Sequence, residues 1–380
     1  MNDVFSTTWG RWTARILSML LGVALAAGFT TWRAFQSIGQ VEFNVPEARS
    51  VLAEMSVEER EETARLFTEE EAARLAEELA ATEEAILLEQ LALAEAEGRV
   101  IEEVVVPYTN PAAVSPPLPD GMFDAYLLIG ADESGRLADA IILVLEPTDG
   151  SATFMVSLPR DLYIPNPCAG RYSRINANLG GCRGVAGGTT LLSWAVETYT
   201  GIKVDHFALV NFAGFAAVVD AVGGVPLCFD YPTRDDKSGL NVAAGCQTAD
   251  GATALAWVRS RRTEQLVDDV WVSLGASDFT RQRREQDLLF LVASRLNSFS
   301  SLGSFQAVVD SVAGSVRLDS AMSFAGAVGL AWEHRGLTAS QVTRLSIPVE
   351  NYRTGSGALV LVPTRSFNAV LSAAYPPAAR

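Results

Sequence analysis

The sequence places carboxylates and arginines directly after apolar segments that we expect to be strands. Asp132 follows one such segment and Asp139 opens the next. Two carboxylates at one edge of a sheet could share a divalent cation. Arg160 and Asp161 follow another apolar run, where open α/β sheets tend to bind ligands. A turn cap and an ordinary surface ion pair are the alternatives at these two places.

More arginines follow in the second half of the chain. Arg259 and Arg261 would point to one face if their segment is extended, and guanidinium groups suit phosphate oxygens. Asp278 fits the N-cap of a helix whose first turns carry Arg281 and Arg284, a good anion site. A solvated basic edge and a plain amphipathic helix are the alternatives. With no persuasive Ser-His or Cys-His pairing, this inventory favours phosphoryl transfer, which depends on positioning and charge neutralisation.

Composition excludes some other classes of function. The 380 residues carry a net charge of -16, which argues against a nucleic-acid partner. Much of the acidity lies between about residues 47 and 104. Only two histidines are present, so a multi-histidine metal centre is nearly excluded.

The N-terminal segment predicts a membrane anchor. Residues 16–32 form an uncharged apolar run bounded by Arg15 and Arg33, with tryptophans near both ends, and predict a transmembrane helix at residues 16–33. The arginines before the run leave residues 1–15 in the cytoplasm, so everything after the anchor is extracellular. A cleaved signal peptide is the alternative, because Ala24-Leu25-Ala26 resembles a processing site.

Three regions of different character follow the anchor. Residues 45–106 are rich in Ala, Glu and Leu and predict an acidic helical stalk, either a short coiled coil or a solvated spacer. Residues 107–122 contain several prolines and predict an extended linker. Residues 123–375 alternate short β-branched strands with helices, which predicts a sheet covered by helices on its faces.

The four cysteines fall into two close pairs, Cys168 with Cys182 and Cys228 with Cys246. Neither spacing is that of a zinc or redox site. Outside the cytoplasm two structural disulfides are expected, with nearest-neighbour pairing favoured by loop length. Four separate buried thiols are the alternative.

The chain resembles the LytR-CpsA-Psr family in several motifs that occur in the family's order. The matching segments are Leu158-Pro159-Arg160-Asp161, Ile175-Asn176-Ala177, Asp205-His206-Phe207, Asn211 to Phe215, Val218 to Val225, Asp250-Gly251, the Arg259/Arg261 pair, and Asp278 with Arg281 and Arg284. Together they extend over about residues 123–350. The anchor before the domain is also the family's usual arrangement.

This resemblance implies a three-layer α/β/α domain with a mixed central sheet. It implies a membrane-bound, extracellular phosphotransferase that moves a glycopolymer phosphate from a polyprenyl diphosphate carrier to a sugar hydroxyl of peptidoglycan. The implied metal is Mg²⁺ (or Mn²⁺), held by Asp132 and Asp139. The residues implied to act on the diphosphate are Arg160, Asp161, Arg259, Arg261, Asp278 and Arg281, with Arg136, Arg174, Arg284 and Gln286 as further substrate contacts.

The sequence departs from the family's pattern at three places. Leu137 stands where the family has an arginine, with Arg136 one step earlier. Arg174 replaces a lysine, which keeps the charge but changes the shape. Glu285 would repel a diphosphate unless it pairs with an arginine or turns away. A hydrolase using the same site and a non-catalytic envelope protein that binds lipid diphosphates are the alternatives to a transferase.

Overall fold

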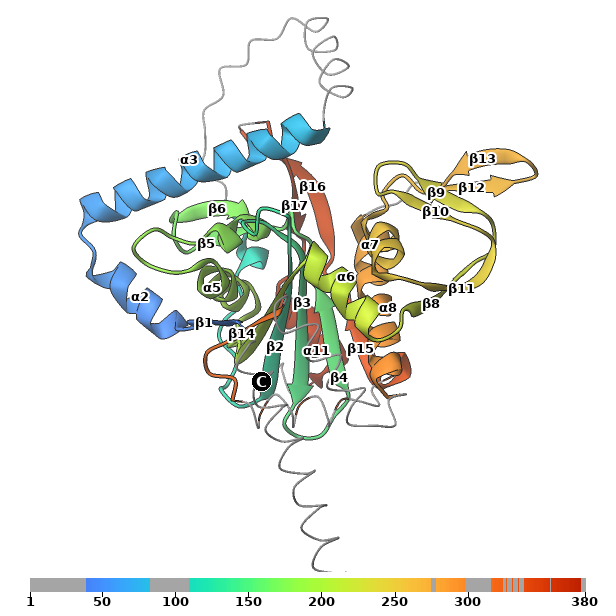
Figure 1. Cartoon of the computed structure of the whole chain (residues 1–380). Coiled ribbons are helices and arrows are strands. Elements are labelled where there is room, and N and C mark those ends of the chain that lie inside the picture. The colour runs from blue at the N-terminus through green and yellow to red at the C-terminus, as the bar shows by residue number, and fades with distance from the viewer. Residues whose placement is uncertain are drawn as a thin grey trace, which may run out of the picture. The chain divides into compact units, whose positions relative to one another are not determined.

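The computed structural model describes residues 39–82, 109–274, 278–297, 316–323, 338–355 and 357–376, together with residues 326, 330 and 334. The chain forms two compact units (Figure 1). Residues 41–209 and 340–380 form one, here called the sheet unit; residues 210–339, grouped with the chain before residue 41, form the other, here called the insert unit. The predicted anchor at residues 16–33 lies outside the described residues. Among the helices that are described, none is long and apolar enough to cross a membrane.

The sheet unit contains a mixed sheet with strands in the order β7-β2-β3-β4-β15. Its strands are β2 (Phe123–Ala131), β3 (Ala138–Pro147), β4 (Thr153–Ser157), β7 (His206–Asn211) and β15 (Val342–Leu345). β2, β3 and β4 pair antiparallel, and β15 pairs parallel with β4. The mixed α/β sheet predicted for this region is therefore confirmed.

Alternation along β2 shows how the sheet acquires its core. Every second residue from Phe123 to Ala131 is buried, as expected of a strand with one face against a core. These side chains cluster with apolar residues of α5 (Gly188–Thr200) and α11 (Phe367–Ala374). Tyr199 and Phe367 meet edge to face, with ring centroids 5.9 Å apart. Burial of this apolar face fixes the strand register.

Shorter elements surround the sheet of this unit. They are η1 (Pro111–Ala113), β5 (Tyr163–Asn166), β6 (Arg171–Arg174), η2 (Ile175–Gly180), η3 (Ala339–Gln341), β16 (Val349–Arg353) and β17 (Leu359–Pro363). η1 lies in the stretch expected to be an extended linker. There Ala113 is fully buried in the core, and the Leu118 N–H donates to the Gly201 carbonyl at 2.7 Å. The described part of this stretch, from residue 109, is therefore anchored to the sheet unit.

The region expected to be one stalk helix begins with two helices, α2 (Val45–Glu54) and α3 (Val57–Thr82). A capping box separates them: the Glu59 N–H donates to the Ser56 hydroxyl at 3.2 Å, and the Ser56 N–H donates to the Glu59 carboxylate at 2.8 Å. Val45 and Phe67 are each 3 % exposed, so these helices bury apolar side chains. In Figure 1, α3 lies along β6. Residues 83–106 lie outside the described chain.

The described part of the insert unit contains three long helices beside small sheets. Its elements are α6 (Phe212–Ala221), β8 (Val225–Phe229), β9 (Thr233–Asp235), β10 (Leu240–Val242), β11 (Gly245–Ala249), α7 (Gly251–Arg259), β12 (Glu264–Val267), β13 (Val270–Ser273), α8 (Asp278–Asn297) and β14 (Val316–Asp319). β1 (Gly39–Val41) lies where the two units join in sequence. β8 pairs with β11, and β9, β10, β12 and β13 form a separate four-stranded sheet. Val219, Val225, Ala254 and Leu288 form the shared core of α6, β8, α7 and α8.

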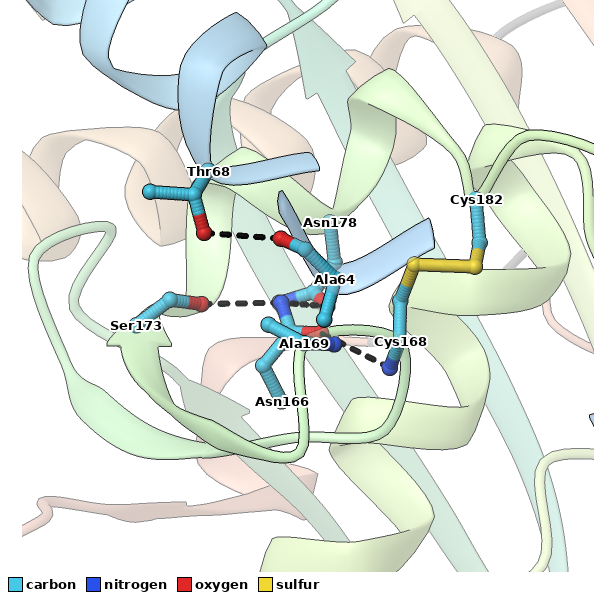
Figure 2. The surroundings of a disulfide bond; sticks show 8 residues. All are labelled: Ala64, Thr68, Asn166, Cys168, Ala169, Ser173, Asn178 and Cys182. Atoms are coloured by element: carbon cyan, nitrogen blue, oxygen red, sulfur yellow. Dashed lines mark hydrogen bonds between the residues drawn. A yellow bond between two sulfur atoms is a disulfide. The ribbon is translucent and has the colours of Figure 1, made fainter. Parts of the chain in front are cut away.

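Both predicted disulfides are present, Cys168–Cys182 and Cys228–Cys246. Cys228 and Cys246 lie directly opposite each other on β8 and β11. The other bridge closes the loop after β5, where the Asn166 side chain accepts from the N–H groups of Cys168 and Ala169 (Figure 2). Nearest-neighbour pairing, favoured by loop length, is confirmed.

Candidate functional site

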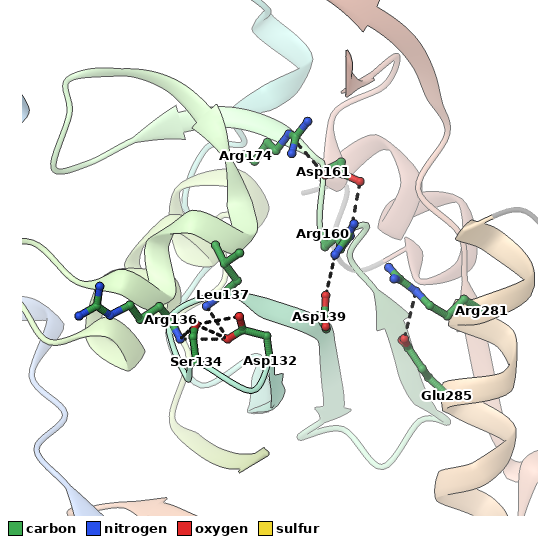
Figure 3. A network of polar contacts seen from close by, with 10 residues as sticks. All are labelled: Asp132, Ser134, Arg136, Leu137, Asp139, Arg160, Asp161, Arg174, Arg281 and Glu285. Atoms are coloured by element: carbon green, nitrogen blue, oxygen red, sulfur yellow. Dashed lines mark hydrogen bonds and ion pairs between the residues drawn. The ribbon is translucent and has the colours of Figure 1, made fainter. Parts of the chain in front are cut away.

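The β2–β3 loop is organised by the carboxylate of Asp132. Its Oδ1 atom accepts from the N–H groups of Arg136 and Leu137, each at 3.1 Å. The Ser134 hydroxyl lies 2.9 Å from Oδ1 and 2.8 Å from Oδ2 (Figure 3). The loop donors therefore fix the orientation of this carboxylate. The contribution of Ser134 was not predicted, because only the folded turn brings its hydroxyl to the aspartate.

Asp139 lies at a β-bulge. Gly130 pairs with Ala140 and Ala131 with Ala138, which leaves Asp139 as an extra residue on β3. Bulges re-aim side chains and are frequent beside active sites. The re-aimed carboxylate meets Arg160, whose Nη1 atom lies 2.7 Å from Oδ1 of Asp139. The structure thus brings together two residues that were predicted from separate motifs.

Asp161 links two arginines of the sheet unit. Its Oδ2 lies 3.6 Å from Nε of Arg160, and its Oδ1 lies 3.4 Å from Nε of Arg174 (Figure 3). Arg174 also donates to the Leu359 carbonyl at 3.0 Å. Asp139, Arg160, Asp161 and Arg174 form one chain of alternating charges, here called the sheet-unit network. Each guanidinium is oriented by a carboxylate, an arrangement that prepares cations for a phosphate ligand.

Carboxylate chemistry at this edge fits a magnesium-type ion. Asp132 and Asp139 are both partly exposed, and Arg160 contacts Oδ1 of Asp139 at 2.7 Å. Mg²⁺ is usually held by one or two carboxylates, with waters and substrate phosphates completing its shell. Within the described part of the chain, no group of three or more His, Cys, Asp or Glu could hold a metal. The donors thus suit a cation that shares its coordination with a phosphate ligand.

Arg136 contributes mainly its backbone to this edge. Its N–H donates to Asp132, whereas its side chain points away from Asp139 and Arg160 in Figure 3. The structure therefore does not bring the Arg136 guanidinium into the sheet-unit network.

In the insert unit, the backbone around Arg259 and Arg261 is not extended, which was the condition for these two side chains to share one face of a strand. Arg259 is the last residue of α7, and Arg261 follows the C-cap residue Ser260. Helix formation is explained locally, since Asp250 caps α7 by accepting from the Thr253 N–H at 2.8 Å. The strand alternation on which the prediction rested therefore does not apply. Arg259 instead lies over the ring of Phe212, 4.5 Å from its centroid.

Asp235, which the sequence did not single out, anchors the turn after α7. Its Oδ2 accepts from the Ser260 hydroxyl at 2.7 Å and from the N–H groups of Arg261 at 2.9 Å and Arg262 at 2.7 Å. Burial alone would raise the pKa of Asp235, but these and neighbouring hydrogen bonds hold it below the ordinary value of 3.8. An ionised Asp235 thus fixes the arginine-bearing turn. The contact spans more than twenty residues, so no local motif revealed it.

The first turns of α8 hold their arginines in two ways. Arg281 and Glu285 are 7 % and 9 % exposed, with Nε and Oε1 3.5 Å apart. Glu285 therefore pairs with an arginine, one of the two arrangements expected for it. Arg284 donates to the carbonyls of Trp257 at 3.1 Å and Ser260 at 2.9 Å. Arg284 thus supports the turn after α7.

Two further residues of α8, Gln286 and Asp278, were predicted to belong to the site. Gln286 is buried, at 6 % exposure. Asp278 is the first residue of α8, and its side chain lies outside the described part of the structure.

Comparison with known proteins identifies the family. Residues 118–373 match the model of the LytR_cpsA_psr family. The chain belongs to this family. The matched range contains every residue of the sheet-unit network and of the insert unit's arginine turn, so the predicted resemblance is confirmed.

Two curated relatives are moderately similar to this LytR-CpsA-Psr protein. The cell wall biosynthesis protein LcpA of Corynebacterium glutamicum is 30 % identical over 247 residues, 59 % of this chain and 45 % of LcpA. The polyisoprenyl-teichoic acid–peptidoglycan teichoic acid transferase TagU of Enterococcus faecalis is 27 % identical over 216 residues, 55 % of this chain and 65 % of TagU. The chain thus spans less than two thirds of either relative.

A solved structure shares the fold. The LytR-Csp2A-Psr enzyme from Actinomyces oris superposes with a TM-score of 0.55 at 24 % identity, covering 70 % of this chain and 95 % of that one. This likeness concerns the fold alone.

Proposed function

We propose that this LytR-CpsA-Psr protein transfers a glycopolymer phosphate from a polyprenyl diphosphate carrier to a sugar hydroxyl of peptidoglycan. The observation that carries the proposal is the sheet-unit network, in which Asp139 and Asp161 orient the guanidinium groups of Arg160 and Arg174. The relatives named as a cell wall biosynthesis protein and a teichoic acid transferase support the class of reaction.

The reaction replaces the phosphoanhydride bond of the carrier by a phosphoester bond to the acceptor sugar. The acceptor hydroxyl oxygen bonds to the phosphorus that carries the glycan, and the bond from that phosphorus to the bridging oxygen breaks. Polyprenyl phosphate leaves with the bridging oxygen, and the hydroxyl proton passes to a base or to solvent. Arg160 and Arg174 neutralise charge on the diphosphate, a main requirement of phosphoryl transfer.

Asp161 acts in this proposal as an orienting residue. Each of its oxygens faces a different guanidinium, at 3.6 Å and 3.4 Å. Its role is therefore to hold Arg160 and Arg174 in the geometry that the diphosphate requires.

Asp132 and Asp139 would hold Mg²⁺ (or Mn²⁺), which when bound supplies Lewis-acid charge neutralisation at the phosphate oxygens. The hydroxyl of Ser134 and the loop N–H groups keep the Asp132 carboxylate oriented for that role. Arg160 limits the rotation of Asp139 through its bond to Oδ1.

The arginines of the insert unit have the same proposed task toward the diphosphate. Arg259 and Arg261 are exposed, and Asp235 fixes the turn that carries Arg261. Arg281 is held by Glu285. Arg284 and Asp235 are proposed as positioning residues for this turn, because their contacts are to its backbone.

We place the catalytic domain outside the cytoplasm, tethered by a single-pass anchor at residues 16–33. Two disulfides support this placement, because such bonds persist in oxidising compartments.

The test uses the purified full-length chain, a polyprenyl-diphosphate-linked glycan and peptidoglycan fragments. Glycan attachment is followed with and without Mg²⁺ in the native protein, Arg160→Ala, Arg160→Lys and Asp139→Ala. Loss of a guanidinium or a metal carboxylate should reduce attachment at least about 100-fold. Arg183→Ala is the matched control, because Arg183 is an exposed arginine of the same unit. Attachment that survives Arg160→Ala at the native rate would refute the proposed site.

A further inference from the structure

Arg174 lies where two small β-ribbons meet. β5 and β6 form one two-stranded ribbon, and β16 and β17 form the other. The two ribbons lie side by side in the sheet unit (Figure 1). Arg174 is the last residue of β6, and its Nη2 atom donates to the carbonyl of Leu359, the first residue of β17, at 3.0 Å. The direction of its guanidinium therefore depends on how the two ribbons are held together.

β17 also holds Asp161, the acidic partner of Arg174. The Leu361 N–H donates to the Asp161 carbonyl at 3.0 Å, and Leu162 pairs with Leu361 as an isolated bridge. One strand thus contacts the backbone of Asp161 and the guanidinium of Arg174. A two-stranded ribbon is only marginally stable by itself. The positions of Asp161 and Arg174 therefore depend on the contacts that fix β17 against β6.

Asn110 contacts both ribbons. Its backbone N–H donates to the Tyr172 hydroxyl of β6 at 2.9 Å, and this hydroxyl donates in turn to the Asn110 carbonyl at 3.2 Å. Its side-chain Nδ2 donates to the carbonyl of Pro363, the last residue of β17, at 2.9 Å. Its Oδ1 accepts from the Ala112 N–H at 2.9 Å, which caps η1. Asn110 thereby joins β6 to β17 directly.

Tyr172 connects this contact to Arg174. The two residues are two positions apart on β6, so their side chains share one face of the ribbon. The Tyr172 ring packs against Tyr163, with ring centroids 5.6 Å apart, and Tyr163 lies directly opposite Arg174 on β5. A displacement of Tyr172 would therefore reach Arg174 both along β6 and through Tyr163.

We propose that Asn110 is a positioning residue for Arg174, acting through the Tyr172 hydroxyl and the Pro363 carbonyl. Asn110 precedes the family-matched residues 118–373, so a segment outside that range completes the support of the sheet-unit network. The assignment deepens the proposed function and rests on it. A guanidinium that is already oriented loses less freedom when a diphosphate binds, and binding is stronger for that reason.

Two substitutions in the full-length protein remove the two contacts separately. Asn110→Asp keeps an oxygen that caps η1 but replaces the donor to the Pro363 carbonyl by a second oxygen. Tyr172→Phe keeps the ring and removes the hydroxyl that bonds the Asn110 backbone. Asn44→Asp is the matched control, because Asn44 caps α2 in the same unit and its side chain bonds Glu47 of that helix.

Two properties are measured for each variant. NMR of protein labelled with ¹⁵N-arginine reports the motion of the Arg174 guanidinium without any ligand, and Arg174→Ala identifies its signal. Calorimetric titration with farnesyl diphosphate and Mg²⁺ reports binding. Asn110→Asp and Tyr172→Phe should each increase the guanidinium motion and weaken binding about fivefold, as expected for the loss of one neutral hydrogen bond. Asn44→Asp should leave both properties at native values.

A double-variant cycle separates this role from general damage to the fold. If Asn110 acts through Arg174, Asn110→Asp should weaken binding in the native background but not in Arg174→Ala. An equal loss in both backgrounds would overturn the proposal, as would native Arg174 motion or native binding in both Asn110→Asp and Tyr172→Phe. A native protein that does not bind farnesyl diphosphate would instead count against the proposed function, and the Arg174 motion would then decide the positioning role by itself.

Discussion

The buried carboxylate of Glu197 should make the stability of the protein depend on pH. Glu197 lies on α5 with its side chain 9 % exposed, and its Oε2 is 2.6 Å from Nη2 of Arg49. Burial raises the pKa of Glu197 from 4.5 to about 7, despite the opposing effects of the Val204 N–H, Arg49 and Lys203; Asp205 adds to the rise. The folded state therefore binds a proton on Glu197 in a range where the unfolded chain does not.

The sign and size of the effect follow from this difference. A carboxyl whose pKa is raised by folding stabilises the protein fully below the unfolded pKa, and this contribution is lost as pH rises through the folded pKa. Folding raises the pKa of Glu197 from 4.5 to about 7. At about 1.4 kcal/mol per unit, ionisation of Glu197 costs up to about 3 kcal/mol of unfolding free energy between pH 4.5 and 8.

The substitution that isolates this effect is Glu197→Gln. Glutamine keeps an oxygen that can accept from the Val204 N–H, now 3.1 Å from Oε1, but it does not ionise. The variant should match the native protein near pH 5 and be more stable at pH 8, by up to about 3 kcal/mol or a melting temperature roughly 6 °C higher.

Thermal unfolding followed by circular dichroism between pH 5 and 8 provides the measurement. Glu61→Gln on the exposed face of α3 is the control for removing one of many acidic charges. The reasoning is refuted if the native and Glu197→Gln curves stay parallel over this range. A less stable Glu197→Gln at pH 8 would also refute it, because the ion pair with Arg49 would then outweigh the cost of burial.

Three further predictions concern the insert unit. Asp235→Ala should lower the melting temperature and weaken farnesyl diphosphate binding, because the N–H groups of Arg261 and Arg262 lose their acceptor; native binding would contradict the role of Asp235 as the anchor of this turn. Replacing Cys228 and Cys246 by alanine should cost about 3 kcal/mol of stability, as expected for closure of a loop of this length, measured by urea unfolding; an unchanged midpoint would contradict this estimate. Asp250→Ala should lower the free energy of unfolding by about 1 kcal/mol through loss of the α7 N-cap. Asp250→Asn should keep most of the stability of the native protein, because asparagine is also a good N-cap residue.

The strands of the sheet unit could be predicted because their signals are local. The segments of β2 and β3 are short apolar runs of the kind that predicts buried strands. The structure has these strands at residues 123–131 and 138–147. Disulfide pairing was also predictable, since short loops favour neighbouring cysteines.

The helix that precedes Arg261 could have been predicted from a local sequence signal. Asp250 followed by Gly251 and an alanine-rich run is a helix-start signal, and α7 does end at Arg259. The prediction that an extended segment would place Arg259 and Arg261 on one face did not weigh that cap. Long-range contacts were beyond any such argument: Asp235 reaches Arg261 and Arg262 across intervening strands, and only the folded chain brings them together.

The acidic character of α3 concealed its buried face. Glutamates dominate its exposed positions, whereas Phe67 and Arg74 are buried against the sheet unit. The composition of a helix is dominated by its larger, solvated face. A helix that buries only a narrow stripe of side chains is therefore easily predicted to be a solvated spacer. The bulge at Asp139 was similarly hidden, because one unpaired residue on β3 leaves the apolar pattern almost unchanged.

The central claim is that the glycan phosphate is transferred to a sugar hydroxyl, and not to water, at a site where Arg160 and Arg174 neutralise charge on the diphosphate. The most direct test runs the reaction in ¹⁸O-labelled water with the lipid-linked glycan, peptidoglycan fragments and Mg²⁺, and analyses the products by mass spectrometry. The proposed transfer predicts glycan joined to peptidoglycan through a phosphodiester without ¹⁸O, lost in Arg160→Ala. Released glycan phosphate carrying one ¹⁸O would show hydrolysis and contradict the claim.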